Sequence, residues 1–239
     1  MKLPWEHVIG IIGLGVLIYG QWFGLVGVPP DRHMGEVARI LFVHVPTAWN
    51  AFAVYTVAFI GALGYLLSGR KGFDHLLEAT LEVGTLLTFM LILQGSIFAR
   101  PTWGVWWTWD PRLVSSAVML AVYVGVLVLR TIVVGDVELR AMLTSVATIL
   151  ASVTLPVTYF SVQIWRSMHQ MQTAPTDIDS PLKMAWRINA IAFALIATWF
   201  IARRYRVARD NYTRREAPPL PEVVRRAKIV QVHPAGESN

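Results

Sequence analysis

Six long runs of apolar residues divide this sequence, and they constrain the fold more than any other feature. Each run is close to the roughly 20 residues that an α-helix needs to cross the hydrocarbon core of a bilayer. The chain is 55% hydrophobic and only 15% charged, which is too little charge for a soluble protein of 239 residues. We therefore expect an all-α integral membrane protein with six transmembrane helices, in residues 8–26, 41–67, 80–98, 113–134, 141–163 and 184–202.

An even number of spans places both termini on the same side of the membrane. The basic residues Arg203, Arg204, Arg206 and Arg209 follow the sixth run directly, and positive charge close to a span stays in the cytoplasm. The connecting loops do not settle the orientation by themselves, because the external side would carry the larger set of basic residues. We expect one transmembrane domain in residues 1–205, with the first, third and fifth loops external. Residues 206–239 are expected to form a basic, partly disordered cytoplasmic tail.

The absence of cysteine excludes several kinds of site from this chain. Disulfides, thiolate metal sites, iron–sulfur clusters and thioether attachment of haem all need cysteine sulfur. The net charge of +6 comes largely from the C-terminal tail. This excess of basic over acidic residues indicates membrane lipid headgroups as partners rather than nucleic acid.

Residues 100–113, between the third and fourth runs, hold four tryptophans within seven positions. Two prolines and a glycine interrupt this tryptophan segment, so we expect a loop at the membrane surface rather than a continuous helix. Wide aromatic rings suit a flat apolar ligand, and guanidinium groups suit a ligand that also carries carboxylates. The candidate ligand-binding residues of the segment are Arg100, Trp103, Trp106, Trp107, Trp109, Asp110 and Arg112.

The same segment also has structural interpretations. Tryptophan is enriched where a bilayer meets water, because its ring is amphipathic, so the set has an alternative role as an interfacial belt. Asp110 stands directly before the fourth run and is suited to cap the N-terminus of that helix. Four tryptophans in seven positions exceed what a belt requires, and we favour the ligand-binding interpretation.

Two histidines are expected on the same side of the membrane as the tryptophan segment. His44 lies near the external end of the second run, two residues before Pro46, and His169 follows the fifth run. Taken singly, each is more often a structural histidine than a ligand. Together with the tryptophans they suit haem, a broad apolar plate with two propionates and an iron that accepts two axial nitrogens. Without cysteine, such a haem would be held non-covalently.

Three motifs resemble those of the CcmC family of haem exporter proteins, within the wider group of WWD-domain haem-handling proteins. The resemblance covers roughly residues 5 to 205. The motifs are Trp103-Gly104-x-Trp106-Trp107-x-Trp109-Asp110-x-Arg112-Leu113, His44-Val45-Pro46-x-Ala48-Trp49, and Tyr159-Phe160-Ser161 through His169-Gln170.

This resemblance implies haem b at the external, periplasmic face of the bacterial inner membrane, with His44 and His169 as axial ligands of the iron. It implies that the WWD segment faces the haem chaperone CcmE, which receives the haem. It further implies a complex with the ABC-transporter subunits CcmA and CcmB and the small subunit CcmD. On this interpretation the chain needs no catalytic acid or base, and it serves cytochrome c biogenesis as an assembly factor rather than as an enzyme.

Two alternatives from other functional classes stay open on the sequence. Two histidine ligands would equally serve a membrane cytochrome that transfers electrons. Aromatic rings beside a carboxylate would also serve a transporter or receptor for another flat ligand, such as a sugar.

Polar residues inside or beside the spans lead to three smaller expectations. Glu78 and Glu82 share a helix face, and we expect them to pair with Arg70 or Lys71. The mixed charges between the fourth and fifth runs, Arg130, Asp136, Glu138 and Arg140, are expected to form a solvated patch. Pro156 is expected to kink the fifth span.

Overall fold

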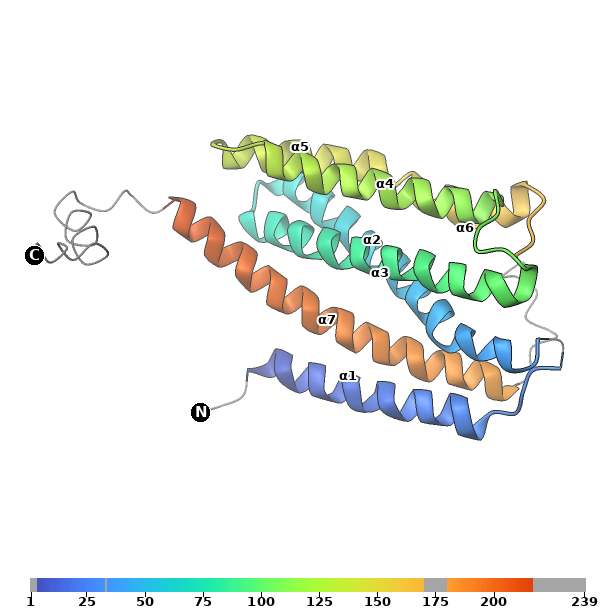
Figure 1. Cartoon of the computed structure of the whole chain (residues 1–239). Helices are drawn as coiled ribbons and strands as arrows, with labels where there is room; N and C mark the ends of the chain where they lie inside the picture. The colour runs from blue at the N-terminus through green and yellow to red at the C-terminus, as the bar shows by residue number, and fades with distance from the viewer. Residues whose placement is uncertain (1–3, 33, 170–179, 217–239) are drawn as a thin grey trace, which may run out of the picture.

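The computed structural model describes residues 4–32, 34–169 and 180–216, which fold into a bundle of long helices (Figure 1). The α-helices are α1 Trp5–Trp22, α2 Leu41–Ser68, α3 Lys71–Trp103, α4 Pro111–Ile132, α5 Val137–Ala151, α6 Thr154–Ile164 and α7 Ser180–Glu216. A π-helical turn, Phe23–Gly27, extends α1, and a 3-10 turn, Glu36–Ile40, precedes α2. Within these residues six helical stretches are long and apolar enough to cross a membrane, which confirms the predicted six spans.

The fifth span, Val137–Ile164, is interrupted between α5 and α6 at Ser152 and Val153. Pro156 has no N–H group, so it cannot bond the carbonyl of Ser152 one turn earlier, and its ring crowds that carbonyl. The Ser152 carbonyl instead accepts from the Leu155 N–H at 3.0 Å. The predicted kink is therefore present, and it lies one helical turn before the proline.

The helices alternate in direction, so the connections fall at two ends of the bundle (Figure 1). The α1–α2 and α3–α4 connections, the end of α6 and the start of α7 lie at one end, which we call the tryptophan end. The α2–α3 and α4–α5 connections lie at the other, the terminal end, where α1 also begins and α7 finishes. The expected meeting of the first, third and fifth loops at one end is confirmed.

Helix α7 is longer than a bilayer requires. Its 37 residues correspond to about 55 Å at 1.5 Å per residue, against a hydrocarbon core of about 30 Å. The expected domain boundary at residue 205 falls inside this helix, which continues to Glu216. The remainder of the expected tail, residues 217–239, lies outside the described residues.

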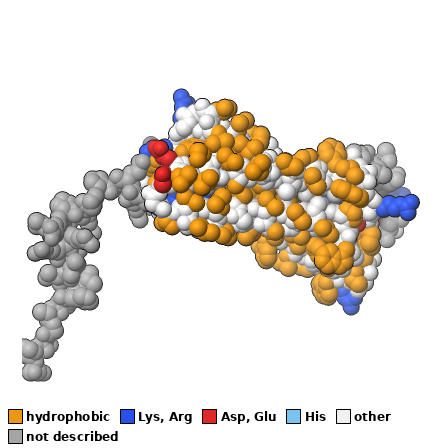
Figure 2. Space-filling view, turned by 90° about the horizontal axis from the view of Figure 1, so that it is seen from above, with side chains coloured by type: hydrophobic (Ala, Val, Ile, Leu, Met, Phe, Trp, Pro, Cys, Tyr) orange, Lys and Arg blue, Asp and Glu red, His pale blue; other side chains and the backbone are white. Residues whose placement is uncertain are grey.

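The surface agrees with a multi-pass membrane protein. Figure 2 shows hydrophobic side chains over most of the face in view, with charged side chains gathered toward the two ends of the bundle. Large apolar side chains point outward along α1, as in Ile11, Ile18 and Trp22, each more than half exposed. Such a band of exposed apolar surface is stable in lipid and would associate in water.

Helix α2 lies at the centre of the bundle and packs against α3, α5 and α7. Its Tyr55 is fully buried and stacks on Tyr123 of α4, with ring centroids 3.6 Å apart. Gly84 of α3 permits this stack, because a Cβ there would lie 2.6 Å from the Tyr55 ring. Close approach through glycine is typical of helix packing in membranes.

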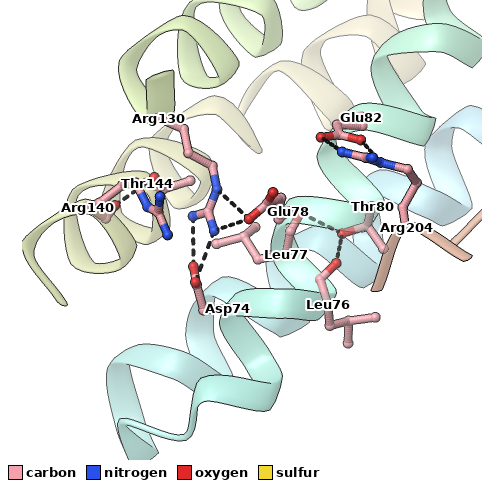
Figure 3. A network of polar contacts seen from close by, with 10 residues as sticks. All are labelled: Asp74, Leu76, Leu77, Glu78, Thr80, Glu82, Arg130, Arg140, Thr144 and Arg204. Carbon is pink, nitrogen blue, oxygen red and sulfur yellow. Dashed lines mark hydrogen bonds and ion pairs between the residues drawn. The ribbon is translucent and has the colours of Figure 1, made fainter. Parts of the chain in front are cut away.

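A network of buried charges ties the helices together near the terminal end (Figure 3). Arg130 of α4 donates to both carboxylate oxygens of Asp74, at 2.7 and 2.9 Å, and its Nε donates to Glu78 at 3.1 Å. Glu82 of α3 pairs with Arg204 of α7. The predicted pairing of Glu78 and Glu82 with Arg70 or Lys71 is therefore wrong.

The predicted solvated patch between the fourth and fifth runs is also wrong for its two arginines. Arg130 and Arg140 are each only 7% exposed. Asp136 does remain at the surface, where its side chain accepts a hydrogen bond from the Leu139 N–H at 2.8 Å and caps α5. Arg130 faces inward because α3, on which Asp74 and Glu78 lie, packs against α4.

Candidate functional site

The tryptophan segment is divided among the end of α3, a short loop and the start of α4. Arg100, Pro101 and Trp103 belong to the last turn of α3, and Gly104 ends the helix with a φ of 78°. Its N–H donates to the Arg100 carbonyl at 3.0 Å, a left-handed helix ending that glycine adopts without strain. Pro111 then opens α4 at a position where no N–H is needed.

Asp110 is the residue around which the site is built. It is 6% exposed and caps α4 by accepting a hydrogen bond from the Arg112 N–H at 2.9 Å, as the sequence predicted. The same carboxylate accepts from the Ser167 hydroxyl at 3.0 Å and from the Met168 N–H at 2.7 Å. One side chain thus joins the loop before α4 to the segment after α6. We call Asp110, Ser167, Met168 and His169 the Asp110 cluster.

His169 completes the Asp110 cluster. Its Nδ1 lies 3.3 Å from Oδ1 of Asp110, and its ring meets Trp103 edge-on with centroids 5.3 Å apart. Burial lowers the pKa of His169, and the nearby Asp110 carboxylate only partly opposes that effect. A carboxylate can only accept, so the neutral ring carries its proton on Nδ1 and leaves the Nε2 lone pair for a metal. Histidines that bind metals are commonly oriented by a carboxylate in this way.

The electrostatics of Asp110 keep it ionised. Burial by itself would raise its pKa, but the hydrogen bonds from Met168, Ser167 and Arg112 outweigh burial and hold the pKa below the ordinary value. A carboxylate that accepts hydrogen bonds from several N–H and O–H groups is stabilised in its charged form. The charge is therefore present at neutral pH, facing His169.

His44 approaches the same region from α2. Its Nδ1 is buried and has no hydrogen-bond partner among the described residues, although buried polar atoms are normally paired. The ring lies within electrostatic range of His169 and Arg112. It also lies against α3 at Gly95, where a Cβ would be 3.2 Å from the imidazole Cε1. The structure thus brings both predicted histidines to the tryptophan end.

The four tryptophans differ in exposure. Trp103 and Trp107 are half-buried, whereas Trp106 is 59% and Trp109 is 85% exposed. Trp107 and Trp109 meet edge-to-face, with centroids 6.3 Å apart. An open hollow of about 510 Å³ lies beside them, lined by Thr108, Trp109, Asp110, Pro111, Arg166, Ser167 and Met168. Of these four tryptophans, Trp103 is the one whose ring meets a histidine ring within the described residues. The exposed rings of Trp106 and Trp109 leave flat apolar surface facing outward.

The two arginines of the segment hold backbone carbonyls. Arg112 donates through Nη1 to the carbonyls of Thr158 and Tyr159 in α6, the latter at 3.1 Å, and Arg100 donates to the Gly104 carbonyl. The sequence analysis predicted that Arg100 and Arg112 contact a ligand. It did not predict their hydrogen bonds to backbone carbonyls. A guanidinium has five N–H groups, so such bonds leave others for an anion.

Residues that the sequence analysis missed complete the site. Ser167 bonds both the Asp110 carboxylate and the His169 N–H, the second at 3.1 Å. Gly95, near the end of the third apolar run, lies against the His44 ring, and a Cβ there would be 3.2 Å from Cε1 of that ring. The available signal was an isolated glycine inside a helical pattern, which often marks a close approach.

Two imidazoles alone do not make a metal site. Across residues 4–32, 34–169 and 180–216, no group of three or more His, Cys, Asp or Glu side chains gathers that could hold an ion. Two imidazoles suit a metal that brings further ligands of its own, as haem iron does. The ring of His169, which Asp110 contacts through Nδ1, and the buried ring of His44 fit that group.

The sequence profile of the family described as Heme exporter protein C, CcmC, matches residues 2–218. The chain belongs to the CcmC family. The matched residues include His44, the whole tryptophan segment and His169, so every residue of the site lies in the shared region.

Curated relatives agree over most of their length. Heme exporter protein C of Bradyrhizobium diazoefficiens is 31% identical over 222 residues, covering 91% of this chain and 81% of the relative. Heme exporter protein C of Escherichia coli K12 is 29% identical over 205 residues, covering 85% and 82%. A putative cytochrome c biosynthesis ccmC-like mitochondrial protein of Marchantia polymorpha is 28% identical over 193 residues, covering 79% and 82%.

Proposed function

We propose that this chain binds haem b non-covalently at its tryptophan end and delivers it to the haem chaperone CcmE during cytochrome c maturation. The observation that carries the proposal is the convergence of His44, His169 and the tryptophan segment at one end of the bundle. Membership of the CcmC family, whose curated relatives are named for haem export, supports it independently. No side chain is assigned as a catalytic acid or base, so the chain acts as an assembly factor.

Each part of the site has a role in holding haem. His44 and His169 would hold the haem iron through imidazole nitrogens, and the tryptophan rings would give it flat apolar contact area. The iron that these two imidazoles would bind is part of haem itself. The remaining N–H groups of Arg100 and Arg112 are placed at the same end and are suited to propionate carboxylates. Asp110 keeps the proton of His169 on Nδ1, away from the iron-binding nitrogen.

The proposed orientation places the terminal end in the cytoplasm and the tryptophan end in the periplasm of a bacterial inner membrane. Arginines 203, 204, 206 and 209 lie in α7 toward the terminal end, as the rule for cytoplasmic positive charge requires. Haem would then be presented on the periplasmic side. CcmA, CcmB and CcmD are the proposed companions of this chain, by its family membership.

Delivery requires that haem be reachable by another protein. Trp106 and Trp109 turn most of their surface outward beside the hollow next to Asp110. Exposed aromatic surface of this kind is characteristic of protein contact sites. The chain has no cysteine, so no thioether has to break before haem leaves.

The test is the visible absorption spectrum of the protein co-purified with CcmE. Wild type is expected to show low-spin haem with two nitrogen ligands, and His169→Ala is expected to lose or alter that spectrum. His7→Ala is the matched control, because His7 lies near the start of α1 at the terminal end, against Trp199. Identical spectra in wild type and His169→Ala would remove His169 from the site. Absence of haem from wild type, even after haem is added, would refute haem binding.

A further inference from the structure

Gly95 stands in the interior of α3, where glycine is unfavourable. Glycine adds backbone freedom to the unfolded chain and weakens a helix interior relative to alanine. The other glycine deep in α3, Gly84, is explained by the ring of Tyr55, which fills the space that a Cβ would take. Gly95 therefore calls for a similar explanation.

The group that lies against Gly95 is the imidazole of His44. A Cβ at Gly95 would lie 3.2 Å from Cε1 of that ring and 4.0 Å from its Nδ1. Carbon atoms in ordinary contact are about 3.5–4.0 Å apart, so a methyl group here would push the ring by a few tenths of an ångström. The edge of the imidazole rests on bare helix backbone.

The two histidines are oriented by different means. His169 is oriented by a hydrogen bond to Asp110 and by the Trp103 ring. The Nδ1 of His44 is buried with no hydrogen-bond partner among the described residues, so no bond at that atom fixes the rotation of the ring. The orientation of His44 thus depends on packing, and Gly95 supplies the surface that it packs against.

We propose that Gly95 is a positioning residue for haem, which sets the place and tilt of the His44 imidazole through its lack of a side chain. This inference rests on the proposed function, in which His44 binds the iron. Ligand groups must be held within about 0.5 Å of their productive geometry. The few tenths of an ångström by which one methyl group would displace the His44 ring are a large part of that distance. A larger side chain at position 95 would exceed it.

The experiment measures haem binding to the purified full-length protein, in complex with any subunits that co-purify. Ferric haem b is titrated into wild type, Gly95→Ala and Gly95→Val, and the bound ferric form is examined by electron paramagnetic resonance. We expect roughly a tenfold or greater loss of affinity, the scale seen when a group that orients a metal ligand is changed, with shifted low-spin g values. Valine is expected to have the larger effect.

Gly15→Ala is the matched control for a glycine in a spanning helix. A Cβ at Gly15 of α1 would have nothing within 4 Å, so its haem affinity and g values are expected to equal those of wild type. Thermal unfolding of each variant is followed in parallel. A variant that binds less haem while unfolding at the wild-type temperature shows a change at the ligand rather than a loss of fold.

A double-mutant cycle with His44→Ala tests whether Gly95 acts through the histidine. Once His44 is absent, Gly95→Ala is expected to have no further effect on haem affinity. The proposal is overturned if Gly95→Ala binds haem with wild-type affinity and g values, or if it weakens binding equally in the His44→Ala background. Failure of the proposed function is distinct: wild type would then take up no haem, or His44→Ala would leave the spectrum unchanged.

Discussion

Removing the Asp110 carboxylate is expected to release the segment that carries His169 while leaving the bundle folded. Asp110→Ala deletes four hydrogen bonds, from the Arg112 N–H, the Ser167 hydroxyl, the Met168 N–H and His169 Nδ1. At about 1 kcal/mol net for each bond, with less for the 3.3 Å contact to His169, the loss is about 3–4 kcal/mol. Asp110 is nearly buried, so solvent screening reduces this value little.

Hydrogen exchange measures the release directly. Three of these bonds, from Ser167, Met168 and His169, hold the segment and together contribute about 2–3 kcal/mol. Because 1.4 kcal/mol corresponds to a factor of ten, peptides covering residues 164–169 should exchange roughly 30 to 100 times faster in haem-free Asp110→Ala. Asp110→Asn should be intermediate, because an amide with its oxygen at the Oδ1 position keeps three acceptor contacts. Its NH₂ group would then face the Met168 N–H, which donates to Oδ2 in wild type.

Asp136→Ala is the matched control for loss of a helix cap. Asp136 caps α5 through one bond, from the Leu139 N–H at 2.8 Å, at the terminal end. Its removal should cost about 1 kcal/mol and accelerate exchange only near the start of α5. Wild-type exchange in residues 164–169 of Asp110→Ala would refute the role given to the Asp110 cluster, because the cluster would then not hold His169.

The same cluster predicts a direction of pH dependence. The folded-state pKa of Asp110 is below the ordinary value of about 3.9, since the hydrogen bonds outweigh burial. The unfolded chain therefore binds the proton first as pH falls, and the stabilisation is complete above the ordinary pKa. It is lost as pH drops through the lower folded value. Exchange in residues 164–169, corrected for intrinsic rates, should rise as pH falls below about 6.5, because the pKa of His169 is lowered in the fold and the opened segment gains that proton first. A second rise should follow below about pH 4, and Asp110→Ala should lack this second rise.

Two further predictions concern the bundle itself. Arg130→Met leaves Asp74 buried without its cation and should destabilise the fold by about 3–5 kcal/mol, measured as a lower unfolding temperature in detergent. Restoring charge balance with Asp74→Leu in the same chain should recover most of that loss. Gly84→Ala places a Cβ 2.6 Å from the Tyr55 ring and should lower the unfolding temperature, whereas Gly125→Ala, with nothing within 4 Å, should not.

Hydropathy and chain direction were enough to predict the six spans and the end of the bundle at which the two histidines lie. Each span is signalled by the apolar residues within it, and consecutive spans must cross the membrane in opposite directions. His44 and His169 could therefore be assigned to the same end of the bundle as the tryptophans. The cap at Asp110 was also predictable, because an aspartate followed by proline at the first helical position is a local signal. These predictions needed no knowledge of which helices touch.

Pairings between distant residues were not predictable in the same way. The sequence suggested Arg70 or Lys71 as partners of Glu78 because they were near in the chain, whereas the actual partner Arg130 lies 52 positions away on a neighbouring helix. Asp110 and His169 are likewise 59 positions apart. Helical periodicity tells which residues share a face, but the neighbour that this face meets depends on how the bundle is arranged.

The two proposed iron ligands differ in what holds them, and this difference bears on delivery. His44 belongs to α2, the central helix of the bundle, and its ring rests on the backbone of α3 at Gly95. His169 lies beyond the end of α6, in a segment joined to α4 by the bonds of one carboxylate. Breaking those bonds frees the backbone that carries His169 without disturbing a helix, whereas the backbone that carries His44 is part of α2 and is packed against α3. A site with one rigid ligand and one that local opening can release holds haem firmly and still allows it to leave.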